Sequence, residues 1–314
     1  MPLYKISIRW LTFAGKPRRN ENNLFFVQFL LKSIFVENSV MFDKVKKLLS
    51  FLKIITSEPS LINHILNLNT VQKNKFIQKY GNFLALPQVE IKDLTQKPVS
   101  YIESFLLDGS SLITDLQLLV SLAGRNEIHS YLEIGTWRGE SVYNVAKEVE
   151  DCTTINLSVA DMRKLGWNIN YAEQHAILSK KNPKILHLEA NTKTFDFGSL
   201  NKKYDLIFID GDHSYDMVLS DTRNVFKHLV HENTVVVWHD YAYSAQKIRY
   251  EVFQAILDGV DPENHKFLYH PKNTMCAVFM KDKLQATAFD EFAMPDKIYN
   301  VSLSEVISFN KEIR

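Results

Sequence analysis

Glycine is scarce in this sequence: ten of its 314 residues are glycine, about 3% where globular proteins average ~7%. A chain with so few glycines keeps them where the backbone needs a conformation or a close approach that other residues do not allow. Two of the ten, Gly135 and Gly139, lie four positions apart. We therefore look for function in that turn first.

Cysteine and long apolar runs are also scarce. The two cysteines, Cys152 and Cys276, have no metal-binding spacing such as C-x-x-C. Nothing suggests a disulfide framework, so a reducing, cytoplasmic location is expected. The most apolar early run, Leu24–Val36, contains Gln28 and Lys32 and is too short to span a bilayer. With 46% apolar and 23% charged residues, the composition excludes a disordered chain or a multi-span membrane protein.

Positive and negative side chains nearly balance, since the net charge is +1. The first 55 residues hold ten Lys or Arg and three acids, whereas the remainder holds 27 basic and 33 acidic residues. Two interpretations stay open: a solvated helical face, or a basic arm that makes weak contact with a membrane or another polyanion. Nucleic acid is not an expected partner. Because Met41 would be a natural start, we expect residues 1–40 to be a loosely attached basic arm or an extension ahead of it.

Hydrophobic spacing divides the rest of the chain. Residues 41–110 are predicted to be mainly helical, since FDKVKKLLSFLKII repeats apolar residues at helical spacing. Within them, Leu86–Pro98 is a proline-bounded extended stretch. Residues 111–282 are expected to form the main domain, opened by a helix over Ser111–Ala123, and residues 283–314 a C-terminal tail. For the N-terminal region we leave three roles open: a cap on the site, a homodimer contact, or docking of a lipid-linked or polyanionic substrate.

From residue 130 onward, β-rich apolar runs alternate with helical stretches. This alternation predicts an α/β fold with a parallel sheet and helices on both faces. The last two runs, KFLYH and MCAVFMK, are separated only by PKNT, which is too short for a parallel crossover. The final strand is therefore predicted to be antiparallel.

The motif YLEIGTWRGES, residues 131–141, reads as a strand, a glycine turn and a helix start. Glycines let a ligand approach the backbone, and the helix N-terminus offers free N–H groups. A dinucleotide fingerprint G-x-G-x-x-G would need glycine where Trp137 stands. The turn thus favours a nucleoside ligand without a pyrophosphate.

Polar residues also follow the next two predicted strands. Asn156 occupies the position that often binds ribose hydroxyls, and Asn191 with Thr192 follows the run KILHLEA. An ordinary turn or loop is an equal alternative at both places.

The largest group of acidic and histidine side chains lies in two motifs, DLIFIDGDHSY at residues 205–215 and VVVWHDY at residues 235–241. Asp210 and His213 follow one predicted strand, and His239 and Asp240 follow the next. Since adjacent strands lie ~4.8 Å apart, Asp210, His239 and Asp240 are predicted to converge as ligands of a divalent cation. His213 is near enough to be a general base. The alternative is that each residue is only a turn or capping residue.

At these motifs the sequence resembles class I S-adenosylmethionine-dependent methyltransferases. More narrowly, it is similar to the catechol O-methyltransferase-like and macrocin O-methyltransferase-like branch, which includes proteins labelled cephalosporin hydroxylase-like. The resemblance covers about residues 111–281. It implies a Rossmann-like seven-stranded sheet of order 3-2-1-4-5-7-6 with strand 7 antiparallel, so that 111–282 would be the methyltransferase domain.

The resemblance also implies roles for single residues. The cofactor residues would be Glu133, Gly135, Thr136, Gly139 and Ser141 at the methionine end, Asn156 at the ribose, Asn191 and Thr192 at the adenine, and Asp210. Asp210 and Asp240 would hold Mg²⁺, and His213 would be the base. The sequence departs from the family pattern where Asn156 and Asn191 replace acids and where His239 replaces Asp, Glu or Asn. Because imidazole is a poor Mg²⁺ ligand, His239 favours Mn²⁺, Fe²⁺ or Zn²⁺.

The expected function is O-methylation of a hydroxyl on a small molecule or sugar, with Asp210 and His213 catalytic and a divalent cation, Mg²⁺ or Mn²⁺, bound. One alternative is a metal-independent methyltransferase with His213 as base. A second is a nucleotide-dependent oxidoreductase, against which Trp137 argues. A third is a non-enzymatic binding module.

Overall fold

The computed structural model describes residues 42–59, 61–62, 68–96 and 101–305. The chain divides into two compact units, residues 1–67 and 68–314. In the first unit, residues 42–57 are helical, as the spacing predicts. The predicted basic arm lies outside the described residues.

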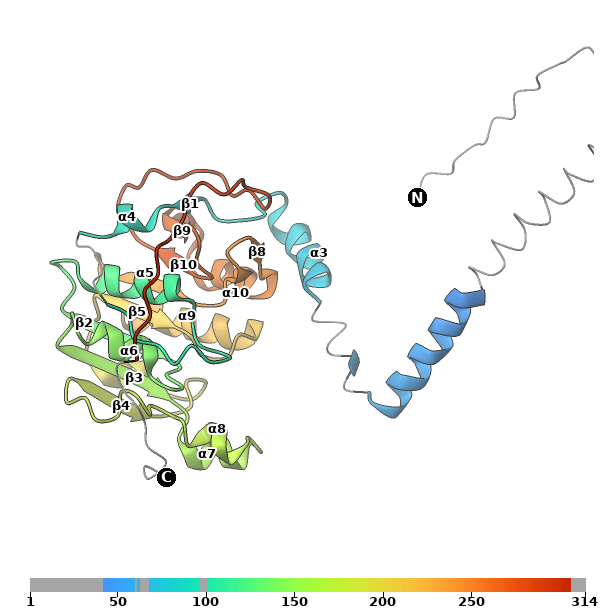
Figure 1. The fold of residues 1–314 in the computed structure, drawn as a ribbon, viewed down its shortest axis with the longest axis horizontal. Coiled ribbons are helices and arrows are strands. Elements are labelled where there is room, and N and C mark those ends of the chain that lie inside the picture. The colour runs from blue at the N-terminus through green and yellow to red at the C-terminus, as the bar shows by residue number, and fades with distance from the viewer. Residues whose placement is uncertain (1–41, 60, 63–67, 97–100, 306–314) are drawn as a thin grey trace, which may run out of the picture. The chain divides into compact units, whose positions relative to one another are not determined.

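The second unit is built on one large sheet of eight strands (Figure 1). Its strands are β1 (Gln88–Val89), β2 (Ser130–Ile134), β3 (Asp151–Asn156), β4 (Ile185–Glu189), β5 (Leu206–Ile209), β6 (Val235–Trp238), β9 (Leu268–Pro271) and β10 (Ala277–Phe279). They lie in the order β1-β9-β10-β6-β5-β2-β3-β4.

The predicted Rossmann-like order is confirmed for seven of these strands. β4, β3, β2, β5, β6, β10 and β9 follow the order 3-2-1-4-5-7-6, and β10 is antiparallel to both of its neighbours. The eighth strand was not predicted. Gln88 and Val89 pair in parallel with β9 at the edge of the sheet, where Pro87 O also accepts the His270 N–H at 2.8 Å. The stretch predicted as an extended boundary is thus partly built into the sheet.

The described helices of this unit are α3 (Asn69–Tyr80), α4 (Ile91–Leu94), α5 (Ile113–Ala123), α6 (Glu140–Val145), α7 (Val159–Lys164), α8 (Ile169–Ala172), α9 (Tyr215–His228) and α10 (Tyr250–Gly259), with short 3₁₀ turns η1 (Phe197–Leu200) and η2 (Pro262–Phe267). Of these, α5 and α6 cover one face of the sheet, and α9 and α10 cover the other. A small two-stranded sheet of β7 (Ala242–Ser244) and β8 (Lys247–Ile248) precedes α10.

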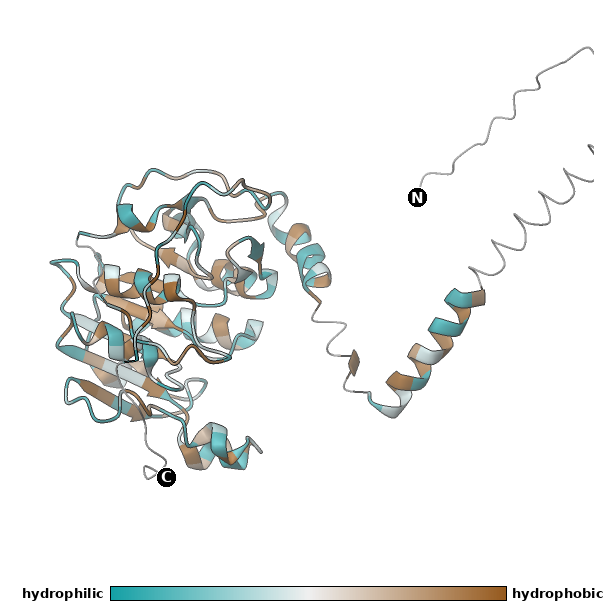
Figure 2. Ribbon diagram, in the orientation of Figure 1, coloured by the Kyte–Doolittle hydropathy of each residue, from teal (hydrophilic) through white to brown (hydrophobic). Residues whose placement is uncertain are grey.

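Alternation along the central strands produces two apolar cores. Leu206 and Phe208 pack with α5 and α6 on one face, whereas Ile207 and Ile209 pack with α9 and α10 on the other. Both faces of a parallel strand are buried, which is why these strands read as unbroken apolar runs. Figure 2 shows the apolar colour on the central strands.

The region ahead of α5 is less helical than its spacing predicts. Residues 101–112 form no helix, and only the four-residue α4 lies between α3 and that stretch in the part described. Pro87 and Pro98 lack the N–H that an interior helix position donates, which agrees with the breaks. Among the described residues no helix is both long and apolar enough to cross a membrane.

Candidate active site

The turn after β2 takes up a backbone conformation that favours glycine at two positions. Gly135 has φ +85°, and Gly139, at the N-terminus of α6, has φ +81°. A Cβ on Gly135 would overlap the carbonyl oxygen of Asp210, and one on Gly139 would lie 2.8 Å from the Cβ of Ser179. The Cβ position of each glycine is therefore occupied by another part of the chain, so both positions require glycine. Their immediate effect is to let β2 and β5 end in contact.

Three polar atoms around this turn are buried with no hydrogen bond of good geometry to any described residue, although weaker contacts of Ser141 and Thr136 with the Glu133 carboxyl partly offset the effect of burial on its pKa. The three atoms are Oε1 of Glu133, Oγ1 of Thr136 and Nε1 of Trp137. Oε2 of Glu133 accepts a bond from the Tyr131 hydroxyl at 2.7 Å. Burial raises the pKa of Glu133 to about 8. Because buried polar atoms are nearly always paired, these orphan groups fit a polar ligand at the turn, and Ser141 lies 7% exposed in the first turn of α6 beside them.

Asn156, at the end of β3, is engaged by the protein. Its Oδ1 accepts the Thr136 N–H at 3.2 Å, and its Nδ2 lies 3.0 Å from Nδ1 of His175. Burial lowers the pKa of His175 to about 4, so the ring is neutral and its Nδ1 can accept the bond from Nδ2. The amide therefore ties the glycine turn to the segment after α8. An acid at position 156 would lack the Nδ2 donor for His175.

Asn191 and Thr192 lie in the loop after β4. Oδ1 of Asn191 accepts the Lys193 N–H at 3.0 Å, so this oxygen stabilises the loop. A hydrogen bond from Thr192 partly offsets the burial that raises the pKa of Asp221 to about 6. Asp221, on α9, is 1% exposed, and the sequence analysis did not identify it.

Asp210, His239 and Asp240 converge, as predicted, where β5 and β6 end side by side. Ile209 and Trp238 are register partners, and the His239 N–H donates to Ile209 O at 3.0 Å. Nδ1 of His239 lies 3.1 Å from Oδ1 of Asp210 and 3.3 Å from Oδ2 of Asp240. One ligand atom from each of the three residues lies within 4.8 Å of the others.

His213 joins this cluster from the loop before α9. Its Nδ1 lies 2.9 Å from Oδ2 of Asp240. Nη1 of Arg249 lies 3.7 Å from the other oxygen of the same carboxylate, Oδ1 of Asp240. The hydrogen bond to Asp240 raises the pKa of His213. Burial alone would raise the pKa of Asp240, but the hydrogen bonds from His213 and His239 outweigh burial and lower it. The carboxylate of Asp240 thus accepts from two imidazoles.

The ring of His239 lies between acids on both sides. Burial lowers its pKa, but the charge of Asp210 and the bond to Asp115 outweigh burial and raise the pKa well above 6.5. Burial raises the pKa of Asp210, and His239 opposes that rise. Without an ion, the cluster is therefore balanced by a positively charged His239.

The donor set fits a divalent cation. Two carboxylates and one imidazole suit Mn²⁺, Fe²⁺ or Zn²⁺ better than Mg²⁺. A hollow of about 10 Å³, lined by Asp210, His213 and His239 among others, is close to the volume that one water molecule needs.

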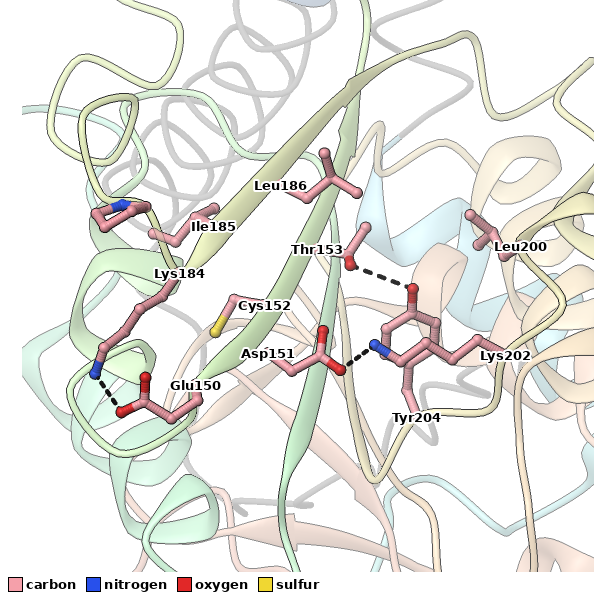
Figure 3. Close-up of a pocket in the computed structure, with 11 residues that line it drawn as sticks. Glu150, Asp151, Cys152, Thr153, Lys184, Ile185, Leu186, Leu200, Lys202 and Tyr204 are labelled. Atoms are coloured by element: carbon pink, nitrogen blue, oxygen red, sulfur yellow. Dashed lines mark hydrogen bonds and ion pairs between the residues drawn. The ribbon is translucent and has the colours of Figure 1, made fainter.

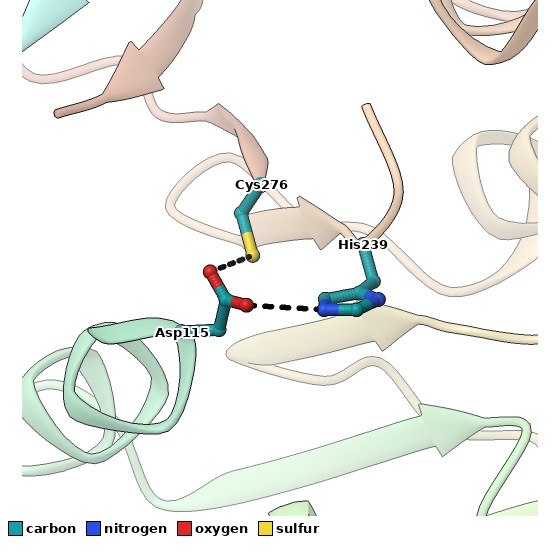
Figure 4. Close-up of side chains that lie close together, drawn as sticks. All are labelled: Asp115, His239 and Cys276. Atoms are coloured by element: carbon teal, nitrogen blue, oxygen red, sulfur yellow. Dashed lines mark hydrogen bonds and ion pairs between the residues drawn. The ribbon is translucent and has the colours of Figure 1, made fainter. Parts of the chain in front are cut away.

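Asp115 is the functional candidate that sequence reasoning missed. It lies in the first turn of α5, is fully buried, and places Oδ2 3.2 Å from Nε2 of His239 (Figure 4). Its sequence signal was an acid alone in the apolar run SSLITDLQLLV. Its partner is 124 residues away along the chain, so spacing did not reveal it.

A separate cavity of about 470 Å³ lies where β3 and β4 begin, at the opposite end of these strands (Figure 3). Its lysines are paired: Lys184 with Glu150 at 2.7 Å, and Lys202 with Asp151. Burial raises the pKa of Cys152 to about 12, so its thiol is not ionised. Among the described residues no histidine lines this cavity, so it lacks the group of carboxylates and imidazoles that lies at the carboxyl ends of β5 and β6.

A family profile described as "Methyltransferase domain" matches residues 132–241. This stretch begins in β2, contains the glycine turn, and ends one residue beyond Asp240. No curated protein sequence matches the chain significantly.

Several solved structures match part of the chain at low identity. The amino pentose methyltransferase CalS10 from Micromonospora echinaspora is 14% identical with a TM-score of 0.29, over 40% of this chain and 48% of that one. An O-methyltransferase from Bacillus cereus is 17% identical with a TM-score of 0.38, over 56% of this chain and 84% of that one. CalS11, a TDP-rhamnose 3'-O-methyltransferase, is 11% identical with a TM-score of 0.38, over 54% and 80%. The chain thus spans about half the length of CalS10.

Proposed function

We propose that the chain is an S-adenosylmethionine-dependent methyltransferase, since a methyltransferase profile matches residues 132–241, and that it methylates a hydroxyl of a small molecule or sugar with the help of a divalent cation. The observation that carries this proposal is the cluster of Asp210, His213, His239 and Asp240. It lies at the carboxyl ends of β5 and β6, the edge at which parallel sheets bind ligands.

The glycine turn supplies the methionine end of the cofactor site. The orphan polar atoms of Glu133 and Thr136 support this role, with Gly135, Gly139 and Ser141 completing the turn. Asn156 would face the ribose while remaining bound to His175. When bound, the cofactor supplies a methyl group whose bond to sulfur breaks as its bond to the acceptor oxygen forms.

Asn191 and Thr192, in the loop after β4, would bind the adenine end of the cofactor. Asp210 would lie between the cofactor turn and the cation ligands. The contact of Gly135 with the Asp210 backbone supports that shared position. Oγ of Thr192 is held near Asp221, which fixes that loop against α9.

His213 is the proposed base. Because its Nδ1 bonds to Asp240, its other nitrogen, Nε2, is the one that can accept the acceptor's hydroxyl proton. The side chain is 48% exposed, which leaves Nε2 within reach of a substrate. A cation held by Asp210, His239 and Asp240 would lower the pKa of that hydroxyl.

A metal-independent methyltransferase is the second candidate, and one observation favours it. A positively charged His239 between Asp210, Asp240 and Asp115 already neutralises carboxylate charge without an ion. His213 would then act alone as the base. Activity that persists in a chelator would support this alternative.

The partners proposed beyond the acceptor are a membrane surface and a second copy of the chain. In the helix over residues 42–57, Val45, Leu49 and Leu52 are exposed at helical spacing, and Lys46 and Lys53 border them. This pattern suits weak contact with an anionic lipid surface. A homodimer through the N-terminal region and a cytoplasmic location remain predictions.

The proposal is tested by measuring S-adenosylhomocysteine formed from S-adenosylmethionine over a panel of sugars and catechols. Acceptors with hydroxyls replaced by hydrogen are the matched blanks. Acceptor-dependent product with the hydroxylated compounds alone supports O-methylation. Equal product with the deoxy compounds would contradict it.

A further inference from the structure

The carboxylate of Asp115 is held by four groups from three parts of the fold. Oδ2 accepts the Leu112 N–H at 3.0 Å and lies 3.2 Å from Nε2 of His239. Oδ1 accepts the Met275 N–H at 2.8 Å and lies 3.7 Å from Sγ of Cys276. The side chain is fully buried, so these contacts fix its place.

The two backbone N–H groups determine what Asp115 can do for His239. Each donates to a different carboxylate oxygen, so both oxygens already act as hydrogen-bond acceptors. An oxygen in this role accepts a further bond rather than donating one. The nitrogen of His239 that faces it must therefore carry a proton, and that nitrogen is Nε2.

This contact leaves Nδ1 as the nitrogen that can offer a lone pair. Nδ1 is the atom that faces Oδ1 of Asp210 and Oδ2 of Asp240. Histidines that bind metals in proteins donate their other N–H to a carboxylate or carbonyl in the same manner.

We propose that Asp115 is a positioning residue that holds His239 with its proton on Nε2 and so makes Nδ1 a ligand of a cation shared with Asp210 and Asp240. The proposal rests on the metal-assisted function above and deepens it. It assigns the site to the cations that accept nitrogen, Mn²⁺, Fe²⁺ and Zn²⁺, ahead of Mg²⁺.

A rival arrangement uses the other side of the same ring. Asp115, His239 and Cys276 also have ligand atoms within 4.8 Å of one another (Figure 4). One observation disfavours an ion there: both oxygens of Asp115 already accept backbone N–H groups. Figure 4 shows Asp115 between the thiol and the ring.

The first test measures Mn²⁺ binding to the full chain by electron paramagnetic resonance, without cofactor or acceptor. The wild-type protein should bind Mn²⁺ and show the nitrogen modulation of one imidazole. In D115N, whose amide group can donate to Nε2 and move the proton to Nδ1, Mn²⁺ affinity should fall about 10- to 100-fold, and the modulation should disappear. H239A should lose affinity to a similar extent, and the double variant should lose no more.

C276A is the matched control, because it changes a neighbour of Asp115 that is not a ligand in this account. It should bind Mn²⁺ as the wild-type protein does. A fall in its affinity would move the ion to the Cys276 side and overturn the proposal. Unchanged affinity and modulation in D115N would also overturn it while leaving metal-assisted methylation standing. If the wild-type protein binds neither Mn²⁺ nor Zn²⁺, the metal-assisted function itself fails, and this inference with it.

A second measurement does not depend on the folding of a variant. In the Zn²⁺-loaded wild-type protein with ¹⁵N-labelled histidine, the ring of His239, assigned by its loss in H239Q, should carry its proton on Nε2. A proton on Nδ1 would contradict the proposal.

Discussion

The backbone of Asp210 lies directly against Gly135, so that a Cβ on Gly135 would overlap the Asp210 carbonyl oxygen and lie 2.7 Å from the Cα of Gly211. This contact joins the turn that we assign to the cofactor to the strand end that carries the catalytic cluster. A substitution at Gly135 is therefore expected to displace the backbone of Asp210.

G135A should both destabilise the protein and disturb Asp210. The new methyl group costs about 1–3 kcal/mol of overpacking, and the left-handed backbone adds about 1–2 kcal/mol. G166A is the matched control, because Gly166 has φ +80° but no atom within 4 Å of its Cβ position. Urea unfolding should show a larger loss for G135A than for G166A. Equal losses would contradict the close contact.

The strands and the antiparallel direction of the last one were predictable from local signals, whereas their order in the sheet came only from the resemblance to the methyltransferase family. The apolar runs, their alternation with helices and the short PKNT link define seven strands and the antiparallel one. β1 escaped prediction because a two-residue strand between prolines has too little pattern to distinguish it from a linker.

The site was predictable only in part, because local sequence signals reveal some of its contacts and not others. Asp210, His239 and Asp240 follow neighbouring strands, so topology alone brings them together. The contacts of Asp115 with His239 and of Asn156 with His175 depend on tertiary packing, which residue spacing does not encode. The two turn glycines were identified correctly as special, but the sequence could not say that Asp210 and Ser179 fill the space beside them.

H213Q should lower kcat about 10²- to 10⁴-fold, the usual effect of losing a general base. Affinity for S-adenosylmethionine should stay within about twofold, since the assigned cofactor residues exclude His213. H228Q, at the other end of α9, is the matched control and should change neither value. Steady-state kinetics and calorimetry check this pair, and full activity in H213Q would remove the residue from the mechanism.

The pH dependence of stability should reveal the buried Glu133. Its pKa is about 8 in the folded protein against an ordinary value of 4.5, so the folded state holds a proton that the unfolded state releases. The free energy of unfolding should therefore fall as pH rises between these values, by up to about 1.4 kcal/mol per pH unit. Denaturant unfolding of E133Q beside the wild-type protein, from pH 5.5 to 7.5, should give a difference in free energy of unfolding between the two proteins that changes by this slope, because the other titrating groups contribute equally to both. Parallel pH curves would contradict the raised pKa.

The helix over residues 42–57 should bind anionic vesicles. Val45, Leu49 and Leu52 are 49%, 62% and 48% exposed, and each buried leucine contributes about 1.5–3 kcal/mol. The double variant L49D/L52D should thus weaken co-sedimentation of the full chain with phosphatidylserine vesicles by about tenfold or more. I54D changes an exposed apolar residue elsewhere around the helix and should have a smaller effect. Equal effects of the two variants, or no binding by the wild-type chain, would remove the lipid contact.

The most direct test of the account is S-adenosylhomocysteine formation with a hydroxylated acceptor, measured on chelator-treated protein with and without added Mn²⁺. We expect turnover that depends on both acceptor and Mn²⁺, and a loss of at least about 10²-fold in D210N. D216N, the same substitution on the first turn of α9, should retain activity. Equal turnover with Mn²⁺ and with chelator, unchanged in D210N, would contradict the central claim that Asp210, His239 and Asp240 hold a cation for methyl transfer.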